Sequence, residues 1–190
     1  MPVGHIRAPL PVKLIVPMLS ARSESFSQAQ GALTERYGPL DYVSADIPFT
    51  YTDYYAPELG SGILRRFVSA RELIDPGDLA SIKLWTNALE DTWREGGHRV
   101  INLDPGYICG GKLVLATTKD QAHRIYLGQG IYAEVTLLYR AREYRALPWT
   151  YPDYASADYH RVFSVIRAGY MAQLRTLRTA PPSLDDQADV

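Results

Sequence analysis

Residues 75–103, DPGDLASIKLWTNALEDTWREGGHRVINL, contain the clearest helix of the chain and the strand that follows it. The turn residues Asp75-Pro76-Gly77 are typical of a helix start, and the glycine pair at residues 96–97 is typical of a helix end. Between them, apolar side chains recur every three or four residues and predict one buried helical face. These side chains are Leu79, Ile82, Trp85 (or Thr86 in its place), Leu89 and Trp93. Residues 99–103 (RVINL) then predict a strand.

The sequence before this segment predicts a strand, a helix and two further extended segments. Residues 12–16 (VKLIV) indicate a buried strand, and the helix after them is capped by Ser23 or Ser25 and ends at Gly38. Residues 40–55 favour an interrupted or edge strand because of Pro48, and residues 63–69 (ILRRFVS) favour a strand. The resulting order, βαββαβ, predicts a ferredoxin-like first half.

The second half is predicted to be rich in β-hairpins and to end in a helix. Residues 112–118 fit a helix or a strand, whereas residues 124–127 and 131–139 predict a hairpin around Gly128-Gln129-Gly130. A three-residue loop places Arg124 opposite Glu134 and Tyr126 opposite Tyr132. The alternate positions are then expected to face the core: Ile125, Leu127, Ile131, Ala133, Val135 and Leu137. A last amphipathic helix begins near Ser156 and uses side chains as far as Leu174.

These patterns predict one α+β domain over residues 11–175, with an N-terminal extension at residues 1–10 and a flexible tail at residues 176–190. The charge is nearly balanced, with 20 basic and 21 acidic residues among 190, so no global field favours nucleic acid or an anionic membrane. The single cysteine, Cys109, excludes an internal disulfide and multi-cysteine zinc sites. We expect no signal peptide, no membrane span and a cytoplasmic location.

Five long segments of the chain resemble a known family. They are PFTYTDYY at residues 48–55, LIDPGDLASIKLWTN at 73–87, NLDPGY at 102–107, KLVLATTKDQAHRIYLGQGIYAEVTL at 112–137 and LPWTYPDY at 147–154. Across residues 11–161 the chain is similar to the prokaryotic family catalogued as domain of unknown function 4416. The resemblance implies a stand-alone intracellular protein, and many members of the family carry the label "GTP-binding protein".

A phosphate-binding loop is the first test of that label. The loop requires GxxxxGK followed by Ser or Thr, because backbone amides hold the phosphates and the hydroxyl binds Mg²⁺. Gly106, Gly111 and Lys112 have the required spacing, but Leu113 stands where the hydroxyl is needed. A degenerate phosphate loop after the strand at residues 99–103 stays open as an interpretation, as does nucleotide binding by another route.

Titratable residues are densest between residues 104 and 134, where they predict a pocket for a small phosphorylated or nucleotide-like ligand. In this hypothesis Lys112, Lys119 and Arg124 bind anionic oxygens, and hydrolase or transferase chemistry is carried by the catalytic candidates His123, Glu134 and Asp104. Structural alternatives are a cross-strand ion pair of Arg124 with Glu134, a hydrogen-bonded His123 and a turn at residues 104–106 that ends the strand before it. The spacing of Asp104, His123 and Glu134 matches no metal-ligand motif, so no metal site is predicted.

Tyrosine is unusually frequent, with 14 tyrosines against 4 phenylalanines, and two loops concentrate it. The first, residues 50–55 (TYTDYY), offers Asp53 and Tyr54 as ligand-binding residues, and the second, residues 149–154 (WTYPDY), offers Trp149 and Tyr151. The two loops could line one cleft and stack on a base or sugar, with Lys83 approaching from the helix. Tyr126 and Tyr132 complete the predicted ligand-binding set.

The alternative function is a non-enzymatic interaction module that uses a tyrosine-rich surface to bind a protein partner. RNA binding is a third interpretation, which the near-neutral charge disfavours. The sequence leaves the cofactor and the oligomeric state open.

Overall fold

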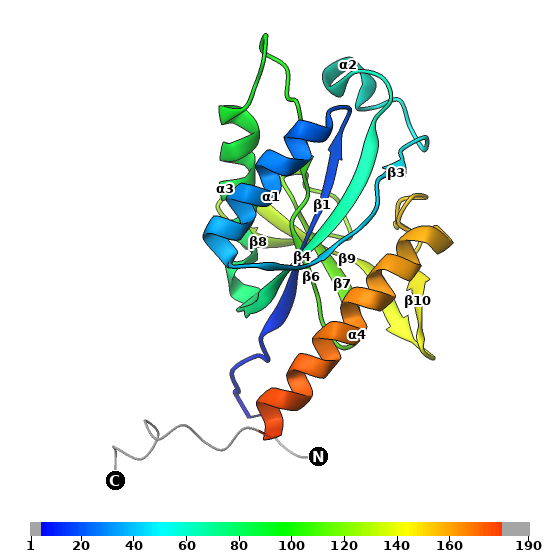
Figure 1. Cartoon of the computed structure of the whole chain (residues 1–190). Helices are drawn as coiled ribbons and strands as arrows, with labels where there is room; N and C mark the ends of the chain where they lie inside the picture. The colour runs from blue at the N-terminus through cyan, green and yellow to red at the C-terminus, as the bar shows by residue number, and fades with distance from the viewer. Residues whose placement is uncertain (1–4, 180–190) are drawn as a thin grey trace.

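The computed structural model describes residues 5–179 and shows an α+β fold with a C-terminal helix (Figure 1). The strands are β1 (Val12–Ser20), β2 (Leu40–Val43), β3 (Ile47–Pro48), β4 (Leu64–Ile74), β5 (Asn102–Leu103), β6 (Gly106–Ile108), β7 (Lys112–Thr117), β8 (Ile125–Gly128), β9 (Ile131–Arg140) and β10 (Glu143–Ala146). The helices are α1 (Ser23–Tyr37), α2 (Ala56–Leu59), α3 (Leu79–Thr92) and α4 (Ala157–Thr179), and a 3₁₀ turn at Pro76–Asp78 precedes α3.

All described strands join one sheet, in the order β10-β9-β7-β6-β1-β4-β2, with β3 on β4, β5 on β1 and β8 on β9. Each pairing in this part of the chain is antiparallel. β1 is central, and all nine of its residues are buried. The segment 112–118, which fitted either a helix or a strand, forms strand β7.

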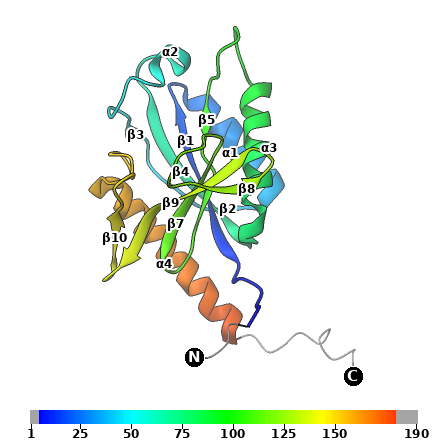
Figure 2. The ribbon, with the colours of Figure 1, turned by 180° about the vertical axis from the view of Figure 1, so that it is seen from behind.

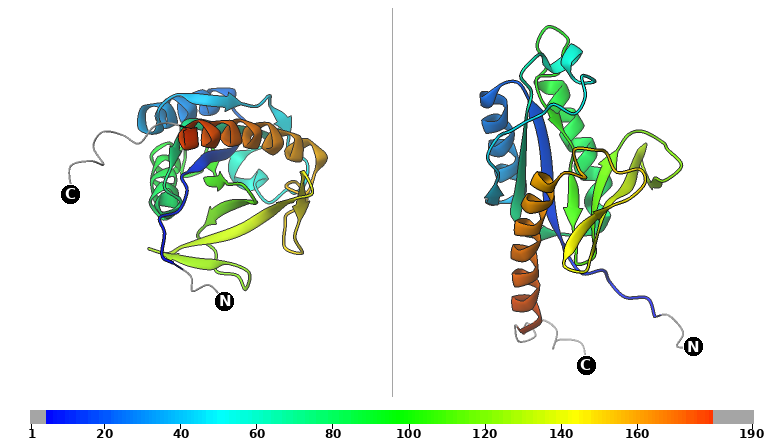
Figure 3. Two further views of the ribbon diagram at one scale, coloured as in Figure 1. Left: turned by 90° about the horizontal axis from the view of Figure 1, so that it is seen from below. Right: turned by 90° about the vertical axis from the view of Figure 1, so that its right-hand side faces the viewer.

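The two faces of the central strands are covered by different helices. Alternate side chains of β1, Leu14, Val16 and Met18, pack with α1 and α3, whereas Ile15 packs in a second core with α4. Figure 1 shows α4 crossing diagonally in front, and Figure 2 shows β7, β8 and β9 from behind. In the right-hand view of Figure 3, β9 and β10 extend away from α1. β1 is therefore buried on both faces, as its apolar sequence requires.

The predicted turn at residues 104–106 is wrong, because the chain does not reverse there. β5 and β6 pair with β1 in one continuous register: Leu103 is opposite Met18 and Gly106 is opposite Ile15. The strand is interrupted only where Pro105 and Pro17 meet the ladder, since neither residue has an N–H to donate. Asp104 N still donates to Pro17 O at 2.9 Å. Asp104 thus sits at a break in a central strand.

The degenerate phosphate loop is also wrong. Residues 109–111 close a β-hairpin between β6 and β7, in which Cys109 N donates to Lys112 O at 3.0 Å, and no helix follows. Gly106 is required for a different reason, because a Cβ atom there would lie 2.2 Å from the carbonyl oxygen of Val114. Glycine at this position lets β6 and β7 approach each other closely.

The β8–β9 hairpin agrees with prediction in its pairing and differs in its faces. Tyr126 is opposite Tyr132 as expected, but the register shifts before Gly128, which pairs with Ile131. Ile125 is 68% exposed, contrary to the predicted core face. Among the described strands β8 pairs with β9 alone, so it lies at an edge of the sheet where its side chains stay exposed. Other departures from the predicted core face are the exposed Leu127 and the buried polar residues Glu134 and Thr136.

The predicted ends of the domain can be compared with residues 5–179 only. Residues 5–11 are without helix or strand, and α4 continues to Thr179, past the predicted boundary at residue 175. Residues 180–190 of the predicted tail lie outside the described residues. None of the described helices is long and apolar enough to cross a membrane.

Candidate functional site

A pocket of about 470 Å³ opens where several separate parts of the chain meet. The loop at residues 49–55 and the loop at residues 151–154 both contribute aromatic side chains to its wall. The polar lining comes from these two loops and from β4, α3, the stretch around β5, the end of β7 with the segment after it, and strand β9. The polar and charged residues are Thr52, Arg65, Lys83, Arg99, Asn102, Asp104, Thr117, Thr118, Lys119, Arg124, Glu134 and Asp153.

Arg65 is the most deeply buried cation of this wall, with 2% of its surface exposed. Its guanidinium carbon lies 5.3 Å from the ring centroid of Phe49 and 5.6 Å from that of Tyr154. Its Nη2 donates to Asp153 Oδ2 at 3.1 Å, and its Nε donates to the Tyr159 hydroxyl at 3.3 Å. Nη1 is buried and has no hydrogen-bond partner. One side of a fixed guanidinium is therefore unsatisfied.

Tyr154 has a second unsatisfied group in the same wall, because its buried hydroxyl also has no hydrogen-bond partner. Burial raises the pKa of Tyr154 well above its ordinary value, so the hydroxyl is neutral and can donate at neutral pH. Burial also raises the pKa of Asp153, although the neighbouring Arg65 acts to lower it. The two groups without partners thus lie beside a carboxyl group whose charge is disfavoured by burial.

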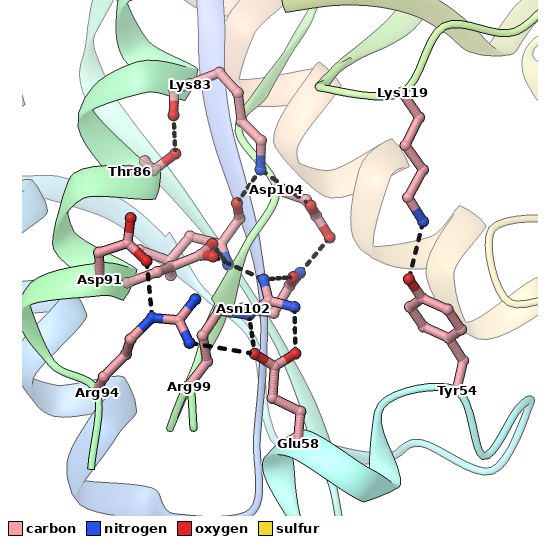
Figure 4. A network of polar contacts seen from close by, with 12 residues as sticks. Tyr54, Glu58, Lys83, Thr86, Asp91, Arg94, Arg99, Asn102, Asp104 and Lys119 are labelled. Atoms are coloured by element: carbon pink, nitrogen blue, oxygen red, sulfur yellow. Dashed lines mark hydrogen bonds and ion pairs between the residues drawn. The ribbon is translucent and has the colours of Figure 1, made fainter. Parts of the chain in front are cut away.

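Asp104 presents a carboxylate to the pocket and is held by two neighbours (Figure 4). Asn102 Nδ2 donates to Asp104 Oδ2 at 2.7 Å. Lys83 Nζ, from the buried face of α3, lies 3.4 Å from Asp104 Oδ1 and donates to Leu103 O at 2.7 Å. Asp104 lies at the break in the strand before Pro105, and these contacts hold its side chain.

Arg99 contacts Asn102, and its side chain donates hydrogen bonds to three residues (Figure 4). Nη1 donates to Glu90 Oε2 at 2.8 Å and to Asn102 Oδ1 at 2.9 Å, while Nε and Nη2 form a bidentate pair with Glu58 at 2.8 and 2.7 Å. The hydrogen bond from Arg99 lowers the pKa of Glu58, whereas burial raises the pKa of Glu90. Arg99 is therefore held by the protein itself.

Lys119 stands at the exposed rim opposite this network (Figure 4). Its Nζ donates to the Tyr54 hydroxyl at 3.2 Å and lies 4.7 Å from the centroid of the Tyr54 ring. Within residues 5–179 it has no acidic partner. Its charge is available to a ligand that enters the pocket.

Arg124, Glu134 and His123 form a cluster at the far side. Arg124 Nε donates to Glu134 Oε2 at 2.9 Å, and His123 Nε2 lies 2.9 Å from the same oxygen. The His123 ring stacks on Trp149, with ring centroids 5.1 Å apart. Arg124 Nη1 also donates to Lys119 O at 3.0 Å and so anchors the loop that carries Lys119. The predicted contact of Arg124 with Glu134 is present, and it connects two parts of the pocket wall.

Residues 10–170 match the family described as a domain of unknown function (DUF4416). The chain belongs to this family. No curated protein and no solved structure matches it.

The DUF4416 domain brings six of the predicted site residues to the pocket wall: Asp104, Glu134, Lys119, Arg124, Tyr54 and Tyr151. The other six lie elsewhere. His123 and Trp149 stack behind Glu134, and Lys112 lies at the opposite end of β7 from the pocket. Tyr126 and Tyr132 form a ring pair on the hairpin, and Asp53 is exposed in the tyrosine loop. Both tyrosine loops line this one pocket.

Sequence reasoning missed Arg65 and Tyr154 as site residues. Arg65 is one of two adjacent arginines in a strand, and alternation places one arginine on each face without telling which face is the pocket. Arg66 lies on the other face, over Phe26 of α1. The sequence feature that could have identified Arg65 is its spacing: it lies two and four residues before Phe67 and Ser69, which are buried on the same face of the strand. The described part of the domain contains no group of three or more His, Cys, Asp or Glu residues that could hold a metal.

Proposed function

We propose that the pocket binds a small anionic ligand, phosphorylated or nucleotide-like. The observation that carries this proposal is the pair of buried donors without partners, Arg65 Nη1 and the Tyr154 hydroxyl, in one pocket wall. Buried polar groups nearly always have a hydrogen-bond partner, and leaving one without costs about 1–3 kcal/mol. Oxygen atoms of a bound ligand would supply both missing acceptors.

Charge and size support the same proposal. Five cationic and three acidic side chains are among the described residues of the wall, and one of the five cations, Lys119, lies at the rim. The volume of about 470 Å³ falls within the range of about 300–1,000 Å³ that is usual for small-molecule sites. The exposed rings of Tyr54 and Tyr151 offer a stacking surface for a base or sugar.

Hydrolase or transferase chemistry is a further part of the proposal. Asp104 is the best placed of the three predicted catalytic residues, because its carboxylate lines the pocket and accepts hydrogen bonds from only two side chains. Glu134 is already contacted by Arg124, His123 and Thr136. We assign Glu134 and His123 to the support of the pocket wall, and Asp104 to proton transfer.

We further propose that the first half is ferredoxin-like. The sheet order β5-β1-β4-β2, with antiparallel neighbours, supports this relationship, as does the packing of α1 and α3 on one face. In such a frame β5 and β6 together occupy the fourth strand position, and β3 and α2 are additions. The loop at residues 49–55, which lines the pocket, belongs to these additions.

Thermal unfolding in the presence of single ligands tests the proposed function. Inorganic phosphate, ribose 5-phosphate and guanine nucleotides are added to the wild type, to Arg65→Lys and to Arg66→Lys. We expect stabilisation of the wild type and of Arg66→Lys, which keeps the pocket intact, and a smaller effect in Arg65→Lys. Equal stabilisation of all three proteins would show that anions bind elsewhere.

A protein-interaction surface is the second candidate function, and the edge strand β8 favours it. Three consecutive large side chains, Ile125, Tyr126 and Leu127, are 68%, 59% and 41% exposed. Exposed apolar edge strands commonly pair with other chains. If this is the function, the sedimentation coefficient of the wild type rises with concentration or with an added partner, and Ile125→Lys abolishes the rise.

A further inference from the structure

We infer that Asp104 forms a second subsite of the pocket, which accepts a hydrogen bond from a neutral hydroxyl group of the ligand. The ligand class is then a hydroxyl-bearing phosphate, either a sugar phosphate or the ribose phosphate part of a nucleotide. This inference rests on the proposed function and deepens it. Arg65 and Tyr154 bind the oxyanion, and Asp104 distinguishes a ligand with hydroxyl groups from a bare phosphate.

The acceptor capacity of Asp104 carries the first step of the inference. An ionised carboxylate has two oxygens with about four lone-pair sites. In the protein Asp104 receives one short hydrogen bond, from Asn102 at 2.7 Å, and one long contact, from Lys83 at 3.4 Å. The side chain is 26% exposed and lines the pocket, so acceptor sites remain open to a ligand.

The orientation of Asn102 carries the second step. Arg99 has only donor groups, so the atom of Asn102 that faces Arg99 Nη1 at 2.9 Å is the amide oxygen. The amide nitrogen is thereby directed at Asp104. Glu58 and Glu90 fix Arg99 in turn, which makes Arg99 and Asn102 positioning residues for the Asp104 carboxylate.

The charges around Asp104 decide which donor it accepts. The ammonium of Lys83 lies 3.4 Å from Asp104 Oδ1, and Arg65, Arg99, Lys119 and Arg124 also line the pocket. A ligand ammonium or a divalent cation at Asp104 would meet Coulomb repulsion from Lys83 at short range. A hydroxyl group donates a hydrogen bond without adding a charge, so it is the donor that this environment favours.

Isothermal titration calorimetry on the full chain tests the inference with matched probes. Inorganic phosphate and butyl phosphate lack a hydroxyl-bearing ligand body, whereas ribose 5-phosphate and guanosine monophosphate contain one. We expect the wild type to bind ribose 5-phosphate about tenfold or more tightly than butyl phosphate, as for one hydrogen bond to a charged group. Comparison of ribose 5-phosphate with guanosine monophosphate then identifies the source of the phosphate.

Asp104→Asn is expected to remove the preference for ribose 5-phosphate over butyl phosphate and to leave butyl phosphate affinity within about threefold. Asp158→Asn, the same change at an exposed residue of α4, keeps the preference. If Asp104→Asn does not fold, as judged by circular dichroism, Asn102→Leu replaces it, because it releases the carboxylate without removing it.

The outcomes separate the two proposals. Phosphates that bind the wild type and lose affinity in Arg65→Lys support the proposed function, whatever Asp104 does. A preference for ribose 5-phosphate that survives both Asp104→Asn and Asn102→Leu overturns the hydroxyl subsite alone. Absence of binding by all four probes at millimolar concentration contradicts the proposed function and, with it, the inference that rests on it.

Discussion

Two buried cations on neighbouring strands of the same sheet, Lys13 on β1 and Arg65 on β4, differ in how they are satisfied. Lys13 is 1% exposed, and its ammonium contacts Asp41, Gln173 Oε1 at 2.8 Å and Arg71 O at 3.3 Å. All three of its donor hydrogens therefore have an acceptor. Arg65 is equally buried, yet Nη1 has none.

The difference separates a structural charge from a candidate binding group. Lys13 joins α4 to β1 and to the strand pair β2–β4 through Asp41 and Gln173, and it lines no part of the 470 Å³ pocket. Arg65 is held by Asp153 and Tyr159, and it is one of the residues that line the pocket. Burial alone does not indicate a binding group, whereas a buried group without a partner in a residue that lines a cavity is a candidate for one.

The largest expected effect comes from removing each cation. Arg65→Met leaves Asp153, whose side chain is 8% exposed, as an uncompensated buried carboxylate, so we expect a loss of about 3–5 kcal/mol in the free energy of unfolding. Lys13→Met should cost less, about 1–3 kcal/mol, because the side chain of Asp41 is 26% exposed and keeps its hydrogen bond from Ser69. Urea unfolding measures both. A larger loss in Lys13→Met would reverse the comparison.

The next largest expected effect is the gain in unfolding free energy when a ligand binds. Ribose 5-phosphate at 100 times its Kd should add about 2.7 kcal/mol to the unfolding free energy of the wild type and of Lys13→Met. Arg65→Lys keeps the charge but loses the free Nη1, and a tenfold weaker Kd at the same concentration reduces the gain to about 1.4 kcal/mol. Urea unfolding with and without ligand checks this. A reduced gain in Lys13→Met would place that lysine in the site as well.

Two buried tyrosines allow the same comparison between a group with a hydrogen-bond partner and one without, and the expected change in stability is smaller. The hydroxyl of Tyr170 donates to Pro11 O at 2.9 Å, so Tyr170→Phe should destabilise the protein by about 1 kcal/mol. The hydroxyl of Tyr154 has no partner, so Tyr154→Phe removes an unsatisfied group and should leave the ligand-free protein at least as stable as the wild type while weakening phosphate binding about fivefold or more. Thermal unfolding and calorimetric titration give the two quantities. A stability loss in Tyr154→Phe equal to that in Tyr170→Phe would mean that its hydroxyl is already satisfied.

The smallest expected effect is a pH dependence of the unfolding free energy that arises from Asp153. Burial raises its pKa in the folded protein, so the folded state holds more protons than the unfolded state once the pH exceeds the ordinary value of 3.8. The wild type should therefore lose stability relative to Asp153→Asn as the pH rises from about 3.8 through the raised pKa, and the difference should stay constant at higher pH. Unfolding free energies measured from pH 3.5 to 8 test the sign. A difference that grows in favour of the wild type would show a lowered pKa.

Sequence patterns predicted the regular elements better than the site. The 3.6-residue spacing in α1 and α3 and the pairing of Tyr126 with Tyr132 are properties of local sequence, and the structure confirms them. The turn expected at residues 104–106 was wrong because Asp104 bonds to Pro17 and Gly106 pairs with Ile15, contacts between residues far apart in the chain. Turn-forming residue types alone cannot reveal that β1, a strand far away in the sequence, pairs with the chain on both sides of Pro105.

The candidate site was predicted only in part, again because sequence patterns describe local segments and not contacts between distant ones. Lys119, Arg124 and Glu134 were found because they are close in the sequence and line one pocket. Arg65 and Tyr154 come from segments about 90 residues apart, and neither shows from its own neighbourhood that a donor lacks an acceptor. Only the packed structure shows which polar groups are unsatisfied.

The most direct test of the central claim is an NMR titration of inorganic phosphate that observes the ¹H–¹⁵N resonances of the arginine side chains. Arg65→Lys assigns the Arg65 signal. We predict that phosphate perturbs the Arg65 guanidinium more than that of any other arginine, with saturation at the Kd measured by calorimetry. A saturating response at other arginines with no change at Arg65 would contradict the assignment of this pocket as the anion site.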